Sequence, residues 1–141
     1  MDIAALVTWL VTAVGGFYML GVWISRGGVR QQRDGSTRLP APVVFGHFLL
    51  AAAGLVLWII YLFADTRALA WIAFALLVPV ALLGLVMFLR WLPVHRAAPS
   101  GGTTAGPAER SIPMAAVIGH GVFAVVTVVL VLLAALGVGA S

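Results

Sequence analysis

The sequence contains no cysteine and no lysine, and it has only four acidic residues in 141 positions. The lack of cysteine excludes disulfides, thiolate metal sites, iron–sulfur clusters and cysteine nucleophiles. Charged residues make up only 9% of the chain, whereas a soluble domain carries about a quarter. Because so few charges cannot cover a water-exposed surface, the composition predicts an integral membrane protein.

Hydrophobic residues, which make up 63% of the chain, gather in four apolar stretches. Each stretch is long enough to cross about 30 Å of hydrocarbon as a helix, and none has a charged residue in its middle. The expected spans cover residues 3–25, 41–64, 69–92 and 114–138. The sequence therefore predicts an all-α, multi-pass membrane protein, with four transmembrane helices that form a bundle in a single domain.

The arginines predict the orientation of these spans. Seven of the eight arginines lie in or beside the first and third connections. The positive-inside rule therefore puts both connections in the cytoplasm and both termini outside, in the inner (plasma) membrane of the cell. The same distribution explains the net charge of +4 without a nucleic-acid partner. Residues 93–113 are rich in Pro, Gly, Ser and Thr, which predicts a flexible cytoplasmic connection.

The second and fourth spans resemble each other in sequence. LPAPVVFGHFLLAAAG, which begins at Leu39, aligns without a gap with IPMAAVIGHGVFAVVT, which begins at Ile112, and both contain the string Pro-x5-Gly-His. The first and third spans match more weakly, at the pairs Trp9/Trp71 and Arg26/Arg90. This internal repeat predicts two tandem helical hairpins, related by an axis along the membrane normal.

His47 and His120 occupy matched positions in the repeat. His47 lies nine residues after Arg38 and His120 lies ten after Arg110, so both are expected about 13–15 Å beyond those arginines, at similar depth. A histidine inside hydrocarbon needs a partner, and it therefore faces the bundle interior. Small residues next to the histidines or on the same helix face leave room there, namely Gly46, Gly54 and Gly119.

Two imidazoles at one depth on two helices can bind a haem iron from both sides. Such a site has no open position for oxygen and favours electron transfer. The propionates of the haem would need cations near the inner interface, and the candidates are Arg26, Arg38, Arg90 and Arg110. Two other interpretations remain open. The histidines can bond helices together in a non-catalytic accessory or scaffold subunit, or they can belong to a proton or metal path.

In its four spans and its His47/His120 pair, the chain resembles the small four-helix b-type cytochromes of membranes, such as the cytochrome b561 group and respiratory membrane anchors. Members of that group usually carry two haems and four histidines, whereas this chain has ligands for one. The resemblance implies a single haem b in an electron carrier or a subunit of a redox complex, rather than a stand-alone enzyme. The exchange partner it implies is quinone or a redox partner subunit. The other expected partners are the lipid bilayer and, in an oligomer, further copies of the chain.

Overall fold

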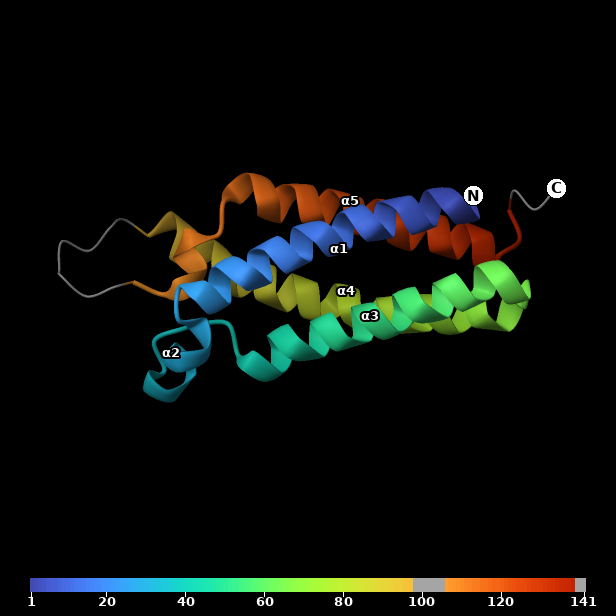
Figure 1. Ribbon diagram of the computed structural model, residues 1–141. Coiled ribbons are helices and arrows are strands. Elements are labelled where there is room, and N and C mark those ends of the chain that lie inside the picture. The colour runs from blue at the N-terminus through green and yellow to red at the C-terminus, as the bar shows by residue number, and fades with distance from the viewer. Residues whose placement is uncertain (98–105, 139–141) are drawn as a thin grey trace.

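The computed structural model describes residues 1–97 and 106–138, and within these residues the chain is helical without a β-strand. The elements, labelled in Figure 1, are α1 (Asp2–Ser25), α2 (Gly28–Asp34), α3 (Ala41–Ala64), α4 (Arg67–Arg96), the 3-10 helix η1 (Ala108–Ser111) and α5 (Met114–Ala135). Four of them, α1, α3, α4 and α5, are long and apolar enough to cross a membrane. The all-helical fold with four such helices, predicted from the sequence, is confirmed.

Local chemistry sets the ends of these helices. α3 and α5 each follow a proline in an extended conformation, Pro40 and Pro113, which needs no N–H partner at a helix start. α3 ends at Ala64, and the left-handed backbone of the next residue, Asp65 (φ 47°), turns the chain into α4. α4 continues to Arg96, so the first residues of the connection that was predicted to be flexible are helical. Residues 98–105 of that connection lie outside the described residues.

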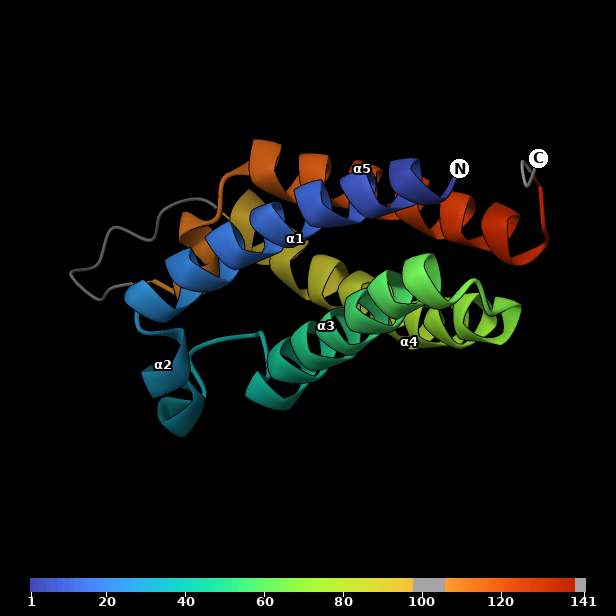
Figure 2. The same cartoon turned by 45° about the vertical axis from the view of Figure 1, so that its right-hand side comes forward.

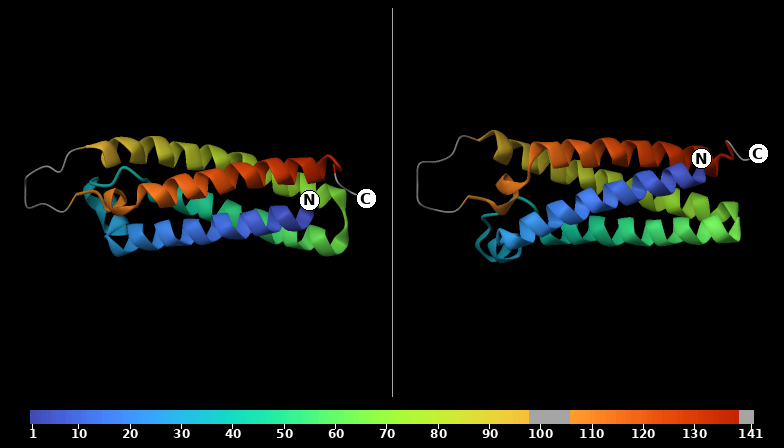
Figure 3. Two further views of the ribbon diagram at one scale, coloured as in Figure 1. Left: turned by 90° about the horizontal axis from the view of Figure 1, so that it is seen from above. Right: turned by 45° about the horizontal axis from the view of Figure 1, so that its top comes forward.

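The four long helices pack as two pairs. α3 packs mainly against α4, and α1 packs mainly against α5, although α1 and α5 lie at opposite ends of the sequence. The α1/α5 pair lies above the α3/α4 pair in Figure 1, and the turned views in Figures 2 and 3 agree with this arrangement. α1 has little contact with α3, so the two helices of the first expected hairpin are not each other's main partners.

The outward faces of the long helices are apolar. Large hydrophobic side chains remain widely exposed on all four helices, for example Val14 (70%), Phe63 (88%), Leu82 (59%) and Val125 (65%). Soluble monomers rarely expose contiguous apolar surface on this scale. The outer surface therefore agrees with the helix lengths in suggesting a multi-pass membrane protein.

Tryptophans fill the interior of the bundle near both ends. Trp9 and Trp58 belong to one buried cluster, and Trp23 and Trp91 belong to a second. None of these four side chains is more than 3% exposed. Large rigid rings therefore fix the spacing between helices on either side of the level at which the histidines lie.

Glu109 ties together the segments at the end of the bundle opposite the two termini (Figure 1). Its carboxylate is buried and accepts hydrogen bonds from the Thr37 hydroxyl (2.8 Å) and the Arg38 backbone N–H (2.6 Å). Its backbone carbonyl accepts a hydrogen bond from the Trp91 indole N–H (3.1 Å). Glu109 thus joins η1 to the connection before α3 and to the last turns of α4.

The short helix α2 was not predicted from the sequence. It lies between Gly27 and Gly35, whose left-handed backbones (φ 88° and 65°) start and stop it. Gln31 and Gln32 of α2 bond outward to neighbouring segments: the Gln31 side-chain oxygen accepts from the Ala108 N–H (2.8 Å), and the Gln32 amide donates to the Leu39 carbonyl (2.6 Å). α2 therefore fastens η1 and the start of α3 at the same end of the bundle.

Candidate functional site: a histidine pair between α3 and α5

The structure brings the two matched histidines together across the bundle. His47 projects from α3 and His120 from α5, each seven residues after the proline that precedes its helix. The centres of the two imidazole rings are 6.2 Å apart, and the ring planes are inclined by 54°. The prediction that both side chains reach the bundle interior at one level agrees with this separation.

Each histidine is held by a backbone carbonyl of its neighbouring helix. His47 Nδ1 lies 2.9 Å from the Val80 carbonyl oxygen on α4, and His120 Nδ1 lies 2.9 Å from the Thr12 carbonyl oxygen on α1. A carbonyl oxygen only accepts, so each Nδ1 must carry the proton and donate it. In a neutral imidazole, Nε2 is then the nitrogen with the free lone pair. Both rings are therefore in the tautomer that can ligate a metal through Nε2, and such carbonyl bonds commonly orient ligating histidines.

Glycines on the neighbouring helices lie directly against the imidazoles. A Cβ atom at Gly84 of α4 would come within 3.3 Å of His47 Cε1, and one at Gly16 of α1 within 3.2 Å of His120 Cε1. Both distances are tighter than ordinary van der Waals contact, so a larger residue would push the ring away. Sequence reasoning missed Gly16 and Gly84, although both glycines are part of a second repeat.

That second repeat corrects the expected register between α1 and α4. Because His47 and His120 are equivalent, the residues that contact them are equivalent too, and Gly16 corresponds to Gly84. The same register aligns the string Gly-x2-Met-x3-Trp of α1, which ends at Trp23, with that of α4, which ends at Trp91. The predicted match of Trp9 with Trp71 is wrong, because Trp9 is 3% exposed in the core and Trp71 is 41% exposed.

The same register also overturns the predicted match of Arg26 with Arg90. Arg26 lies ten residues after Gly16, whereas Arg90 lies only six residues after Gly84. The two halves of the bundle thus repeat a unit made of a histidine, the carbonyl that accepts from it and the glycine beneath it. In each half this unit is built by two packed helices.

The 6.2 Å between ring centres matches the spacing of two axial ligands of one iron. Two metal–nitrogen bonds of about 2 Å, each extended by about 1.1 Å from nitrogen to ring centre, add up to about 6 Å. Two imidazoles that bind one metal from opposite sides can be rotated about the line that joins their ligating nitrogens. An angle of 54° between the ring planes is therefore compatible with such binding. The described residues offer neither Nε2 a hydrogen bond.

Protein side chains alone do not complete a metal site here. Among the described residues, no group of three or more His, Cys, Asp or Glu side chains could hold a metal ion. A structural zinc needs four protein ligands and a catalytic zinc usually three. Two histidines alone therefore fall short of the ligand number that a protein-only metal site needs.

The three glycines that were predicted to make room differ in their surroundings. A Cβ at Gly119 would meet nothing within 4 Å, and one at Gly46 would only reach Leu83 at 3.9 Å. Gly54 instead lies under the Trp9 indole, where a Cβ would come within 3.0 Å of the ring. A Cβ at Gly46 or Gly119 would thus meet open space or ordinary contact, while Gly54 serves the packing of α3 against α1.

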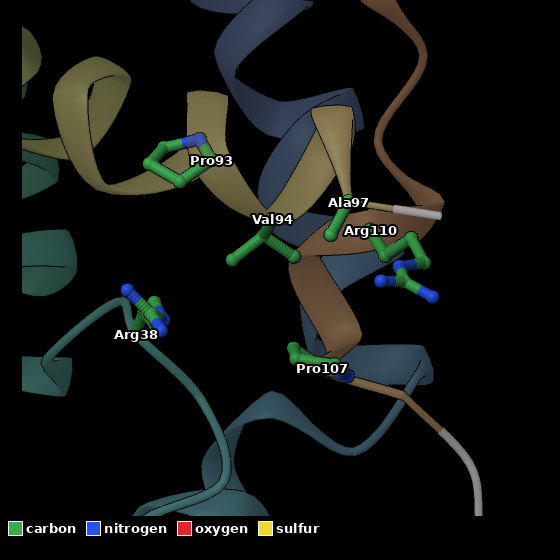
Figure 4. A pocket seen from close by; sticks show the side chains of 6 residues that line it. All are labelled: Arg38, Pro93, Val94, Ala97, Pro107 and Arg110. Carbon is green, nitrogen blue, oxygen red and sulfur yellow. The ribbon is translucent and has the colours of Figure 1, made fainter. Parts of the chain in front are cut away.

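The four candidate arginines all lie toward the end of the bundle that carries α2 and η1. Arg26 directly follows α1, and Arg90 of α4 donates from Nη1 to the Arg38 carbonyl (3.3 Å). Arg38 and Arg110 line one cavity of about 170 Å³, shown in Figure 4. Arg90 is the nearest to the histidine level, since six residues past Gly84 correspond to about 9 Å along the helix. The third histidine, His95, stacks on Trp91 at 4.6 Å, away from the pair.

No protein-family model, no curated protein and no solved structure matches the chain. What the protein does must therefore be inferred from its own side chains.

Proposed function

We propose that the protein binds one haem b between α3 and α5, with His47 and His120 as the two axial ligands, and that it carries electrons in a membrane. The observation that supports this most strongly is the pair itself: two imidazoles 6.2 Å apart, each with its Nδ1 proton donated to a carbonyl. Their Nε2 atoms are both acceptors, so they cannot hydrogen-bond to each other. Two imidazole nitrogens with free lone pairs are the ligands that a haem iron takes from the protein, and this is what supports the proposal.

The alternative is a non-catalytic accessory or scaffold subunit. It is favoured by the bonds from His47 to Val80 and from His120 to Thr12, which already join neighbouring helices without any cofactor. Interhelical hydrogen bonds in membranes contribute only about 0.6 kcal/mol on average. This function explains the two Nδ1 hydrogen bonds. It gives no reason why both Nε2 atoms keep a free lone pair, or why a glycine lies against each imidazole ring.

Two histidine ligands leave the iron without an open position, which suits electron transfer and not oxygen binding. When bound, the haem supplies one-electron exchange at its iron. The protein's own residues would then position it, because the hydrogen bonds to the Val80 and Thr12 carbonyls fix the orientation of the two imidazole rings. Quinone or a redox subunit is the proposed exchange partner, as in the cytochrome b561 group and respiratory anchors.

The proposed orientation puts the end with α2 and η1 in the cytoplasm and both termini outside the inner membrane. It is supported by the arginines, because Arg26, Arg38, Arg90 and Arg110 all lie toward that end (Figure 1). The opposite end carries Arg67 and is closed by a short turn at Asp65 and Thr66. Under this orientation, the haem lies nearer the cytoplasmic side.

A visible absorption spectrum of the purified full-length protein tests the haem proposal. We expect Soret and α bands that sharpen when dithionite is added, with one haem per chain, because a six-coordinate bis-histidine iron is low-spin in both oxidation states. Expression with a haem precursor ensures that supply does not limit loading. A colourless protein under these conditions would support the scaffold function instead.

Alanine at Gly16 or Gly84 is expected to weaken haem binding about 5- to 160-fold, because overpacking a close contact costs about 1–3 kcal/mol. Each new Cβ would lie 3.2–3.3 Å from an imidazole carbon and must turn that ring. The measurement is haem affinity by titration, together with the electron paramagnetic resonance signal, which reports ring orientation.

Gly21→Ala is the matched control for these variants, since Gly21 is also in α1 and a Cβ there meets nothing within 4 Å. Gly21→Ala raises the helix propensity by the same amount as Gly16→Ala and Gly84→Ala. If Gly16→Ala and Gly84→Ala bind haem as Gly21→Ala does, the glycines do not position the histidines.

A further inference from the structure

We propose that Arg38 and Arg110 form a binding site for a phosphate group at the end of the bundle that carries α2 and η1. The two arginines line one cavity with Pro93, Val94, Ala97 and Pro107, and Figure 4 shows them on two different segments, one to each side of Val94. The cavity measures about 170 Å³. Since a water molecule takes about 30 Å³, the space suits a phosphate group with some water and is too small for a drug-sized ligand or a macrocycle.

Arg110 has an unused donor at this site. Its Nε atom is buried and has no hydrogen-bond partner among the described residues. A buried charged donor without an acceptor is costly, so the arrangement calls for an acceptor beyond the described residues. Guanidinium groups bind phosphate through paired N–H donors, and this geometry makes arginine the preferred residue for such groups.

Among residues 1–97 and 106–138, no carboxylate lines the cavity to neutralise the two arginines. Glu109 precedes Arg110 in sequence, but its two carboxylate oxygens accept hydrogen bonds from the Thr37 hydroxyl and from the Arg38 backbone N–H. The Arg38 guanidinium itself is exposed and free to turn toward a ligand. The site thus keeps an uncompensated positive charge that favours an anion.

The cavity lies at a different level from the histidine pair. Val94 follows Gly84 by ten residues in α4, which corresponds to about 15 Å along the helix axis. The phosphate site therefore does not depend on the proposed haem. If the helices span a bilayer, this end lies among lipid headgroups, so the phosphate can come from a phospholipid or from solution.

The test is phosphate binding by the purified full-length chain in detergent, measured as the shift of its thermal unfolding midpoint. The probes are inorganic phosphate, short-chain phosphatidylglycerol and, as a lipid without phosphate, diacylglycerol of the same chain length. Chloride at equal ionic strength controls for screening. We expect phosphate-bearing probes to stabilise the protein, and Arg110→Gln and Arg38→Gln to weaken their binding at least tenfold. Arg33→Gln removes an exposed charge from α2 and should change binding less than twofold.

Each outcome decides the proposal. Stabilisation by phosphatidylglycerol alone identifies a headgroup site, and stabilisation by both phosphate probes identifies a site open to solution; both support it. Equal effects of Arg110→Gln and Arg33→Gln, or equal stabilisation by diacylglycerol, would overturn it. The double variant His47→Ala/His120→Ala should bind phosphate like the wild type. If the double variant binds phosphate but the haem-loaded wild type does not, the two arginines bind haem propionates instead. This result would also overturn the phosphate-site proposal.

Discussion

Replacing His47 or His120 by alanine is expected to abolish the low-spin haem spectrum of the protein. Each single variant removes one axial ligand, which leaves a five-coordinate, high-spin iron or a chain that loses its haem during purification. The double variant is expected to bind no haem. The measurement is the absorption spectrum before and after reduction, with haem quantified per chain.

His95→Ala is the matched control, because His95 stacks on Trp91 away from the pair and is the one remaining histidine of the chain. It should keep the wild-type spectrum. If both His47→Ala and His120→Ala keep it as well, the ligand assignment is wrong. A third result would support the scaffold function. If the wild type and both variants are colourless, and each variant loses only about 0.6 kcal/mol of unfolding free energy, the histidines only form hydrogen bonds between helices.

Truncating Glu109 to alanine is expected to cost about 3 kcal/mol of unfolding free energy, because hydrogen bonds to a charged group contribute about 1.5–3 kcal/mol each. The variant leaves the Thr37 hydroxyl and the Arg38 N–H without their acceptor in a buried place. Glu109→Gln keeps one acceptor oxygen and should lose about half as much. The measurement is denaturant unfolding in detergent, followed by circular dichroism.

Asp34→Ala provides the comparison for Glu109, since Asp34 is an exposed acid on α2 at the same end of the bundle. Its loss should change stability by less than about 0.5 kcal/mol. Equal losses for Glu109→Ala and Asp34→Ala would show that the buried carboxylate does not hold η1 against the connection that contains Thr37 and Arg38.

Hydropathy and length were enough to predict the four long helices. Apolar runs of about 20 residues leave few alternatives to a helix, and Pro40 and Pro113 mark where two of them begin. The pair His47 and His120 was also predictable, because two ionisable residues stand out in apolar segments and share the string Pro-x5-Gly-His. Membrane insertion, orientation and haem binding stay predictions.

The packing of the helices could not be predicted from the same sequence. Apolar residues cover every face of these helices, so the pattern carries little information about which face meets which neighbour. This is why the pairing of α1 with α5 and the contacts of Gly16 and Gly84 with the histidines came only from the structure. The repeated string Gly-x2-Met-x3-Trp could have revealed that Gly16 corresponds to Gly84. Aligning Trp9 with Trp71 placed the two helices in a different register, in which this string does not match.

Low-temperature electron paramagnetic resonance of the oxidised, purified protein tests the central claim most directly, because it reports how many strong axial ligands the ferric iron has. We expect a single low-spin ferric signal, with one spin per chain, that disappears in both His47→Ala and His120→Ala. A high-spin ferric signal in the wild type, or no iron signal in protein expressed with ample haem, would contradict the claim that these two imidazoles hold one haem between them.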